Sequence, residues 1–200
     1  MPWSVKKVVK KTVALLLTGV MLAACGATPH EPGAGGARKW VPPNSDSDSG
    51  ERTIEIYAAV IRRLVTKDHT FGGSSSPFEH VYVVDGAVED AGNPMEGDGE
   101  PGAPFSDEVK GGLKEELGGL PPIDFVSDPD SVRLGTDKME GVKNEGVIIT
   151  LSPIARDGDR VEVPNSLWCG GLCGQWLTYV VELKGDGWEV TGTTGPSAIS

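Results

Sequence analysis

The fold is decided by residues 146–192, GVIITLSPIARDGDRVEVPNSLWCGGLCGQWLTYVVELKGDGWEVTG, where β-branched and aromatic runs alternate with turns. Asp157 with Gly158, and Asp186 with Gly187, are pairs that tight hairpin turns prefer because glycine tolerates a positive φ. The pattern predicts strands over Gly146–Ile154, Arg160–Trp168, Trp176–Lys184 and Gly187–Gly192. Short strands joined by turns favour an antiparallel β-meander.

Two helices and two strands are predicted before this meander. Apolar residues recur at helical spacing from Thr53 to Lys67, which predicts an amphipathic helix with one face on a core. A second helix should follow Ser106, whose hydroxyl can cap it, although Gly111 and Gly112 weaken it by about 1 kcal/mol each relative to alanine. The additional strands are predicted over Phe78–Val84 and Ile123–Val126.

These elements predict an α+β fold in which one or two N-terminal helices pack on an antiparallel β-meander. The folded part should be a single domain over residues 53–200, which is long enough to bury one hydrophobic core. Residues 25–52 mix Pro, Gly, Ser and Asp with almost no apolar periodicity, so we expect a flexible tether there.

Residues 1–24 have the charge and hydropathy pattern of a secretory signal peptide. Lys6, Lys7, Lys10 and Lys11 precede an uncharged stretch that runs to Ala24. As a helix this stretch would span about 20 Å, well short of the roughly 30 Å hydrocarbon core of a bilayer. We therefore expect an export signal rather than a permanent membrane-spanning helix.

The sequence Leu22-Ala23-Ala24-Cys25 at the end of this stretch resembles the lipobox of bacterial lipoproteins. The resemblance implies transfer of a diacylglyceryl group to the Cys25 sulfur and cleavage of the chain before it. Two acyl chains suit stable anchoring, because a single chain holds a protein only marginally. The chain would then be lipid-anchored at the cell membrane on the extracytoplasmic side. The alternative is a buried cysteine in a hydrophobic N-terminal helix.

The exported part is strongly acidic. The chain has a formal net charge of −11, and removing residues 1–24 with their four lysines moves it to −15. Nucleic acids and anionic bilayer surfaces need clustered Lys and Arg on the protein, so neither is expected as a partner. Membrane contact should come through the diacylglyceryl anchor, and a basic envelope partner would suit the acidic surface.

Residues 168–190, WCGGLCGQWLTYVVELKGDGWEV, resemble the C-terminal segment of a group of bacterial exported proteins. In that group a CGGLCG motif precedes a strand with a tyrosine, a turn, and a strand that carries glycine, tryptophan and valine. The resemblance extends from about Gly146 onward and implies an α+β fold without an activity. The group's usual tyrosine after the motif is absent here. The matching residues are Cys169, Gly170, Gly171, Leu172, Cys173, Gly174, Tyr179, Gly187, Trp188 and Val190.

Two cysteines, Cys169 and Cys173, remain once Cys25 carries a lipid, and they lie in a compartment where disulfides persist. The three residues between them allow a tight turn that brings the two Cα atoms within bonding range. We expect a structural disulfide that closes a strand-to-strand loop, with the flanking Trp168 and Trp176 burying it.

Other chemistry at this motif is open but less favoured. A thiol-redox pair would lack the helix N-terminus that lowers a thiol pKa, because a strand is predicted after the motif. A zinc site could combine both cysteines with His69 and His80, but the histidines lack the paired spacing of a zinc finger. The bridge therefore remains the preferred interpretation.

No metal site, cofactor or catalytic residue is predicted. The paired acids fit no calcium-loop pattern, which needs a central glycine and a closing glutamate at fixed positions. Serines occur without a Gly-x-Ser-x-Gly elbow or a supported Ser, His and Asp set. The acidic pairs considered are Asp46 with Asp48, Asp128 with Asp130, and Asp157 with Asp159.

Two functions from different classes follow. The first is a non-enzymatic, membrane-anchored binding or scaffold module that engages an unidentified envelope partner through its acidic face or long loops. The second is an envelope thiol-redox protein or enzyme that uses Cys169 and Cys173.

Overall fold

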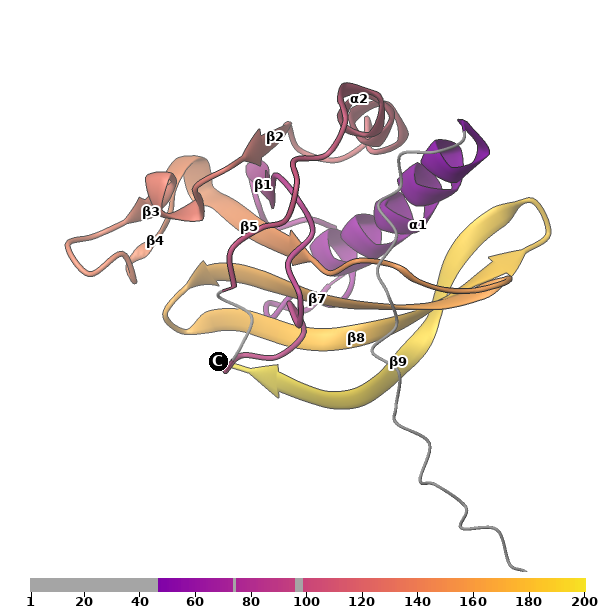
Figure 1. Cartoon of the computed structure of the whole chain (residues 1–200). Coiled ribbons are helices and arrows are strands. Elements are labelled where there is room, and N and C mark those ends of the chain that lie inside the picture. Colours follow the sequence, from indigo (N-terminus) through magenta and orange to yellow (C-terminus); the bar gives the residue numbers. More distant parts are fainter. Residues whose placement is uncertain (1–46, 74, 96–98) are drawn as a thin grey trace, which may run out of the picture. The chain divides into compact units, whose positions relative to one another are not determined.

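The computed structural model describes residues 47–73, 75–95 and 99–200 (Figure 1). The signal sequence, Cys25 and residues 26–46 of the predicted tether lie outside these residues. The helices are α1 (Ser47–Thr66), α2 (Asp107–Glu116) and the short 3-10 helices η1 (Pro129–Ser131) and η2 (Lys143–Glu145). The strands are β1 (His80–Val84), β2 (Ile123–Val126), β3 (Arg133–Leu134), β4 (Gly141–Val142), β5 (Gly146–Leu151), β6 (Ala155–Asp157), β7 (Arg160–Gly170), β8 (Cys173–Lys184) and β9 (Gly187–Ile199).

The main sheet is mixed, with the order β2-β1-β5-β7-β8-β9 and with β6 paired to β7. The antiparallel prediction is right for β5, β7, β8 and β9, but β1 pairs in parallel with both β2 and β5. The parallel part arises because α2 lies between β1 and β2 in the chain, and such a crossover returns the next strand in the same direction. The α+β class is therefore confirmed, and the purely antiparallel meander is wrong.

Both predicted helices form, and both pack on one face of the sheet (Figure 1). The sheet contributes alternate residues to this core, such as Val81 and Val83 of β1 and Val163 of β7, because successive side chains in a strand point to opposite faces. Helix α1 begins at Ser47 rather than at the predicted Thr53. Its first turn is thus drawn from the segment that we expected to be tether.

The contact between the helices explains one of the two glycines in α2. The Ser106 hydroxyl accepts a hydrogen bond from the Val109 amide at 3.2 Å, which confirms the predicted cap. Gly112 lies against Ile54 of α1, and a Cβ at this position would lie 2.4 Å from Ile54 Cδ1. A Cβ at Gly111 would meet nothing within 4 Å. Only Gly112 is therefore required for the close approach of the helices.

A partly exposed hydrogen-bond network fixes the end of α1 to the sheet. The Tyr179 hydroxyl of β8 donates to Asp68 Oδ2 at 2.8 Å, and Arg63 Nε of α1 donates to the same oxygen at 2.7 Å. Burial, and then the hydrogen bond to Asp68, raises the pKa of Tyr179. Burial also raises the pKa of Tyr57, whose hydroxyl donates to the Ser152 carbonyl at 3.0 Å.

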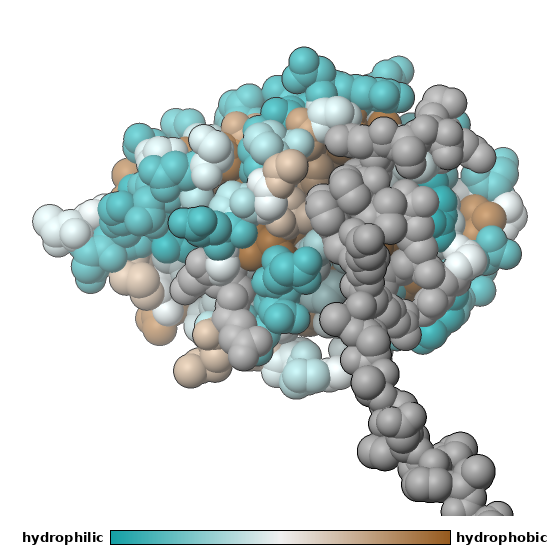
Figure 2. Space-filling view, viewed as in Figure 1, coloured by the Kyte–Doolittle hydropathy of each residue, from teal (hydrophilic) through white to brown (hydrophobic). Residues whose placement is uncertain are grey.

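The other face of the sheet carries a second, smaller core. It includes Tyr82 and Val84 of β1 and Ile148 of β5, covered by residues of the segments that follow β1 and β2. Figure 2 shows one side of the molecule, where hydrophilic side chains predominate and hydrophobic ones appear singly or in small groups. No helix within the described residues is long and apolar enough to cross a membrane.

Candidate functional site

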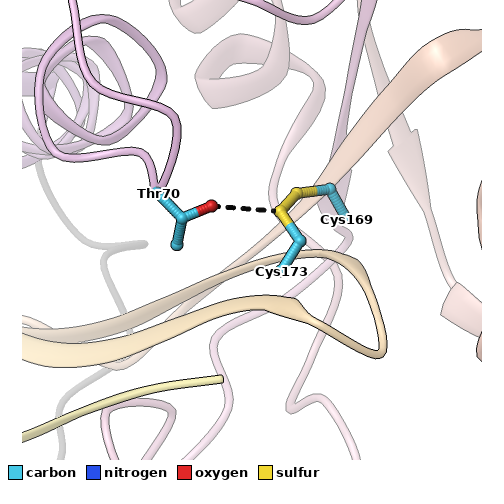
Figure 3. The surroundings of a disulfide bond; sticks show 3 residues. All are labelled: Thr70, Cys169 and Cys173. Carbon is cyan, nitrogen blue, oxygen red and sulfur yellow. Dashed lines mark hydrogen bonds between the residues drawn. A yellow bond between two sulfur atoms is a disulfide. The ribbon is translucent and has the colours of Figure 1, made fainter.

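Cys169 and Cys173 form a disulfide at the tip of the β7–β8 hairpin, as predicted (Figure 3). Their Cα atoms lie 5.2 Å apart, which is within the usual range for a disulfide. The chain can close this loop because β7 is irregular between Trp168 and Gly170, and Gly170 adopts a φ of +155°. The predicted lipid attachment residue, Cys25, lies outside the described residues.

The surroundings of the disulfide differ from the prediction. Cys173 belongs to the core under the helices, and the Thr70 hydroxyl donates to its sulfur at 3.4 Å (Figure 3). Trp168 and Trp176 lie on the opposite face of the sheet, so they do not bury the bridge. The prediction was wrong because odd and even positions of a strand face opposite sides, and each tryptophan is one or three residues from a cysteine.

The structure does not assemble the zinc alternative. His69 is buried beside Phe78, with ring centroids 6.1 Å apart, whereas His80 Nε2 lies 3.0 Å from Asp124 Oδ2. Among the described residues, no three His, Cys, Asp or Glu side chains are grouped so that they could hold a metal ion. Cys169 lies in strand β7 and Cys173 begins strand β8, so neither cysteine is itself at a helix N-terminus.

The acidic pairs that fall in the described residues make local contacts. Asp128 Oδ1 accepts from the Asp130 amide at 2.9 Å and so caps η1. Asp130 is paired with Lys138 at 2.7 Å and with Arg133 at 3.2 Å; the hydrogen bond from Lys138 is the largest influence that lowers the Asp130 pKa. Asp159 is exposed. The side chains of Asp46, Asp48 and Asp157 lie outside the described part of the chain.

A cleft of about 670 Å³ opens on the second face of the sheet, and the sequence did not predict it. Its floor is contributed by β5, β7 and β8, and its walls by segments that follow β1 and β2. On a further side of the cleft, the β3–β4 loop contacts the β7–β8 loop. The Gly171 amide donates to the Met139 carbonyl there at 2.8 Å. The volume lies within the range of roughly 300–1,000 Å³ that small-molecule sites occupy.

The floor of the cleft is a patch of neighbouring side chains from three strands. Ile148 pairs with Trp168 and Thr150 with Ser166 across β5 and β7, and Ser166 pairs with Trp176 across β7 and β8. Pairing across a sheet places these side chains on one face. The floor therefore presents two indoles and two hydroxyl groups together.

The indole of Trp176 lies across Gly174, its neighbour on the same face of β8. A Cβ on Gly174 would come within 2.4 Å of Trp176 Cη2 and within 2.7 Å of Ser200 Oγ. Gly174 is itself the partner of Trp168 in the strand register. The glycine thus lets the Trp176 ring lie flat on the sheet, next to the position of Trp168.

Arg133 brings a positive charge into the cleft. Its guanidinium carbon lies 4.6 Å from the centre of the Trp168 ring, and its Nη1 is paired with Asp130 at 3.2 Å. Stacking of a guanidinium on an indole is a favourable cation–π contact. Arg133 Nε is buried and has no hydrogen-bond partner among the described residues.

Several polar groups of the cleft have no partner within the described part of the chain. The hydroxyls of Thr150 and Ser166 and the indole N–H groups of Trp168 and Trp176 make no hydrogen bond there. Glu100 and Asp128, at the walls, make no ion pair with the described residues. These groups are free to meet the hydrogen-bonding needs of a ligand.

Comparison with protein family models, with curated proteins and with solved structures finds no match to this chain. The sequence carried one signal for the cleft, the alternation of Ser166 and Trp168 with the core residue Leu167 along β7, which could have marked a second functional face.

Proposed function

We propose that the chain is a bacterial envelope lipoprotein, anchored through Cys25, whose folded domain is a non-enzymatic binding module. The cleft on the second face of the sheet is its ligand site. The lipobox-like sequence before Cys25 and the acidic composition support export and lipidation. The existence of the cleft is the observation that carries the binding role.

The chemistry of the cleft favours binding over catalysis. Activation of a serine or threonine hydroxyl requires a base within hydrogen-bond reach. Within the described residues, neither Ser166 nor Thr150 makes a hydrogen bond to such a base. Pockets that combine apolar walls with a few polar groups are the usual form of a ligand site.

The thiol-redox alternative has less support. The disulfide packs against the core under the helices, where Cys173 is 8% exposed. Redox-active cysteines are commonly placed at helix N-termini or beside cations, which lower the thiol pKa. The neighbour described at Cys173 is the neutral Thr70 hydroxyl.

A thermal-shift screen tests the binding role. The full chain, extracted from membranes, is titrated with neutral oligosaccharides, spermidine, inorganic phosphate and a short fatty acid, and so is the Trp176→Leu variant. A ligand of the cleft raises the melting temperature of the native chain but not of the variant. If no compound produces such a difference, the binding role assigned to the cleft is wrong.

The anchor has its own test, because the lipid attaches only to a cysteine sulfur. We expect Cys25→Ser to remain unprocessed or to be released from membranes, whereas Cys169→Ser should stay attached. Metabolic labelling with a fatty acid should mark the native chain and the Cys169→Ser variant alone. Normal labelling and detergent-phase partitioning of Cys25→Ser would disprove lipidation at this residue.

A further inference from the structure

We infer that the cleft binds a neutral saccharide, which it recognises through the half-buried indole of Trp176 and the neighbouring hydroxyls of Thr150 and Ser166. This inference rests on the proposed binding role of the cleft. It follows from comparing the groups of the cleft with the needs of four ligand classes: anions, cations, lipids and uncharged polyols.

Anions are disfavoured by the charges of the cleft. Among the described residues, its lining includes the acids Glu100, Asp128 and Asp130 and the base Arg133. Asp130 is engaged with Arg133 and Lys138, so it holds the guanidinium that an anion would need. A phosphate or carboxylate would also meet the unpaired carboxylates of Glu100 and Asp128, and like charges repel.

Cations are disfavoured by the occupation of Trp168. The ring of this tryptophan already has Arg133 over its face at 4.6 Å. A ligand cation would have to approach that guanidinium or replace it, and would then leave the half-buried Arg133 without its stacking partner. Among the described residues that line the cleft, Trp176 is the other aromatic side chain and can offer its face to a ligand.

Purely apolar ligands are disfavoured by the polar groups on the floor. A fatty chain laid over Thr150 and Ser166 would remove their hydroxyls from water without replacing the hydrogen bonds, which is unfavourable for each group. The indole N–H of Trp176 would incur the same penalty. The cleft needs a ligand that carries hydrogen-bonding groups.

An uncharged polyol satisfies all of these groups at once. Each ligand hydroxyl can both donate and accept, so it can donate to the carboxylates of Glu100 and Asp128 and accept from the donors. The donors include the Thr150 and Ser166 hydroxyls and the indole N–H of Trp176. The apolar face of a sugar ring can stack on the Trp176 indole, because an aromatic side chain offers a flat apolar surface with a polar edge.

Calorimetric titration of the full chain tests the ligand class. The chain is held in a detergent without a sugar headgroup, because a glycosidic detergent would compete for the cleft. The probes are triacetylchitotriose, cellotriose and maltotriose, with spermidine, inorganic phosphate and octanoate as representatives of the other classes. We expect saturable binding of at least one trisaccharide, accompanied by a change in tryptophan fluorescence.

Variants locate the binding. Trp176→Leu should weaken binding about tenfold or more, as expected for an aromatic anchor. Thr150→Val and Ser166→Ala should each weaken it about fivefold, the value of one hydrogen bond. Thr178→Val is the matched control, since Thr178 is a half-buried threonine on the same sheet face outside this cleft, and it should bind normally.

The outcomes separate this inference from the proposed function. Binding of spermidine, phosphate or octanoate that depends on Trp176, without saccharide binding, overturns the ligand class but leaves the binding role in place. Saccharide binding that is equally weakened by Thr178→Val, or unchanged by Trp176→Leu, overturns the site. If no probe of any class binds, both the saccharide inference and the binding role are rejected.

Discussion

The two neighbouring glycines of α2 should respond in opposite ways to the same substitution. Alanine lowers the conformational freedom of the unfolded chain, which makes a helix-interior glycine about 0.5–1 kcal/mol less favourable than alanine. At Gly111 the added methyl group meets nothing within 4 Å. We therefore expect Gly111→Ala to stabilise the protein by that amount.

At Gly112 the same gain is opposed by a steric conflict. The new Cβ would lie 2.4 Å from Ile54 Cδ1, 3.0 Å from its Cγ1 and 3.2 Å from its Cγ2. Overpacking of this kind typically costs about 1–3 kcal/mol. Gly112→Ala should thus be less stable than Gly111→Ala by roughly this cost, which for a domain of this size is a difference in melting temperature of about 2–12 °C.

Chemical denaturation of both single variants measures the two free energies of unfolding, and a third variant tests the cause. Replacing Ile54 by valine removes Cδ1, the atom closest to the new methyl group. In the Ile54→Val background, Gly112→Ala should therefore lose most of its penalty, while the effect of Gly111→Ala stays the same. Equal stabilities of Gly111→Ala and Gly112→Ala, or an unchanged penalty after Ile54→Val, would refute the steric explanation.

Two other predictions concern the disulfide and the buried tyrosines. Replacing Cys169 and Cys173 together by serine should leave the fold intact but lower its stability by about 2 kcal/mol, because a five-residue ring constrains the unfolded chain only modestly. The measured quantity is the melting temperature, and two alkylatable thiols in the unreduced native protein would contradict the bridge. Stability should also fall as the pH rises above 10.0, the ordinary tyrosine pKa, because Tyr57 and Tyr179 keep their protons longer in the folded chain than in the unfolded one. Tyr179→Phe should flatten this alkaline decline in denaturation midpoints, and an unchanged slope would contradict it.

Local sequence signals predicted the elements well, because each depends on contacts close in the chain. The Ser106 cap and the 3.6-residue spacing after Thr53 act within a few residues. The turn predicted at Asp186 and Gly187 lies one residue earlier, at Gly185 and Asp186, because Gly187 pairs with Lys184 as the first residue of β9. The start of α1 was placed too late because Ser47–Arg52 is polar, and its turn is held by contacts that the pattern does not record. Gly50, for example, packs against Glu108 of α2.

The order and direction of the strands were harder to predict from the sequence, because they depend on pairing between distant segments. The apolar runs of β1, β2 and β5 are short and buried, and nothing in Val81–Val84 distinguishes a parallel partner from an antiparallel one. The decisive fact is that α2 lies between β1 and β2 in the chain, so these strands cannot be joined by a short hairpin turn as β7 and β8 are. An alternation of helix and strand in the predicted order could have indicated it.

The cleft was missed for a related reason. The sequence showed Trp168 and Trp176 beside the cysteine motif, and proximity in the chain suggested that they cover the disulfide. In a strand, however, a side chain shares a face with positions two residues away and with its cross-strand partners, not with its neighbour in sequence. The register that pairs Ser166 with Trp176 and Thr150 with Ser166 therefore assembles the candidate site from three strands.

The β7–β8 hairpin thus contributes residues to both faces of the sheet, with a different role on each face. Towards the helices it presents the disulfide, which closes the tip of β7 and β8 and accepts the Thr70 hydrogen bond. Away from the helices it presents both tryptophans to the cleft. Because the bridge fixes the loop between Trp168 and Trp176, it should also hold the two indoles in register. A structural disulfide and a ligand site are therefore compatible within the CGGLCG segment, and neither requires redox chemistry of the cysteines.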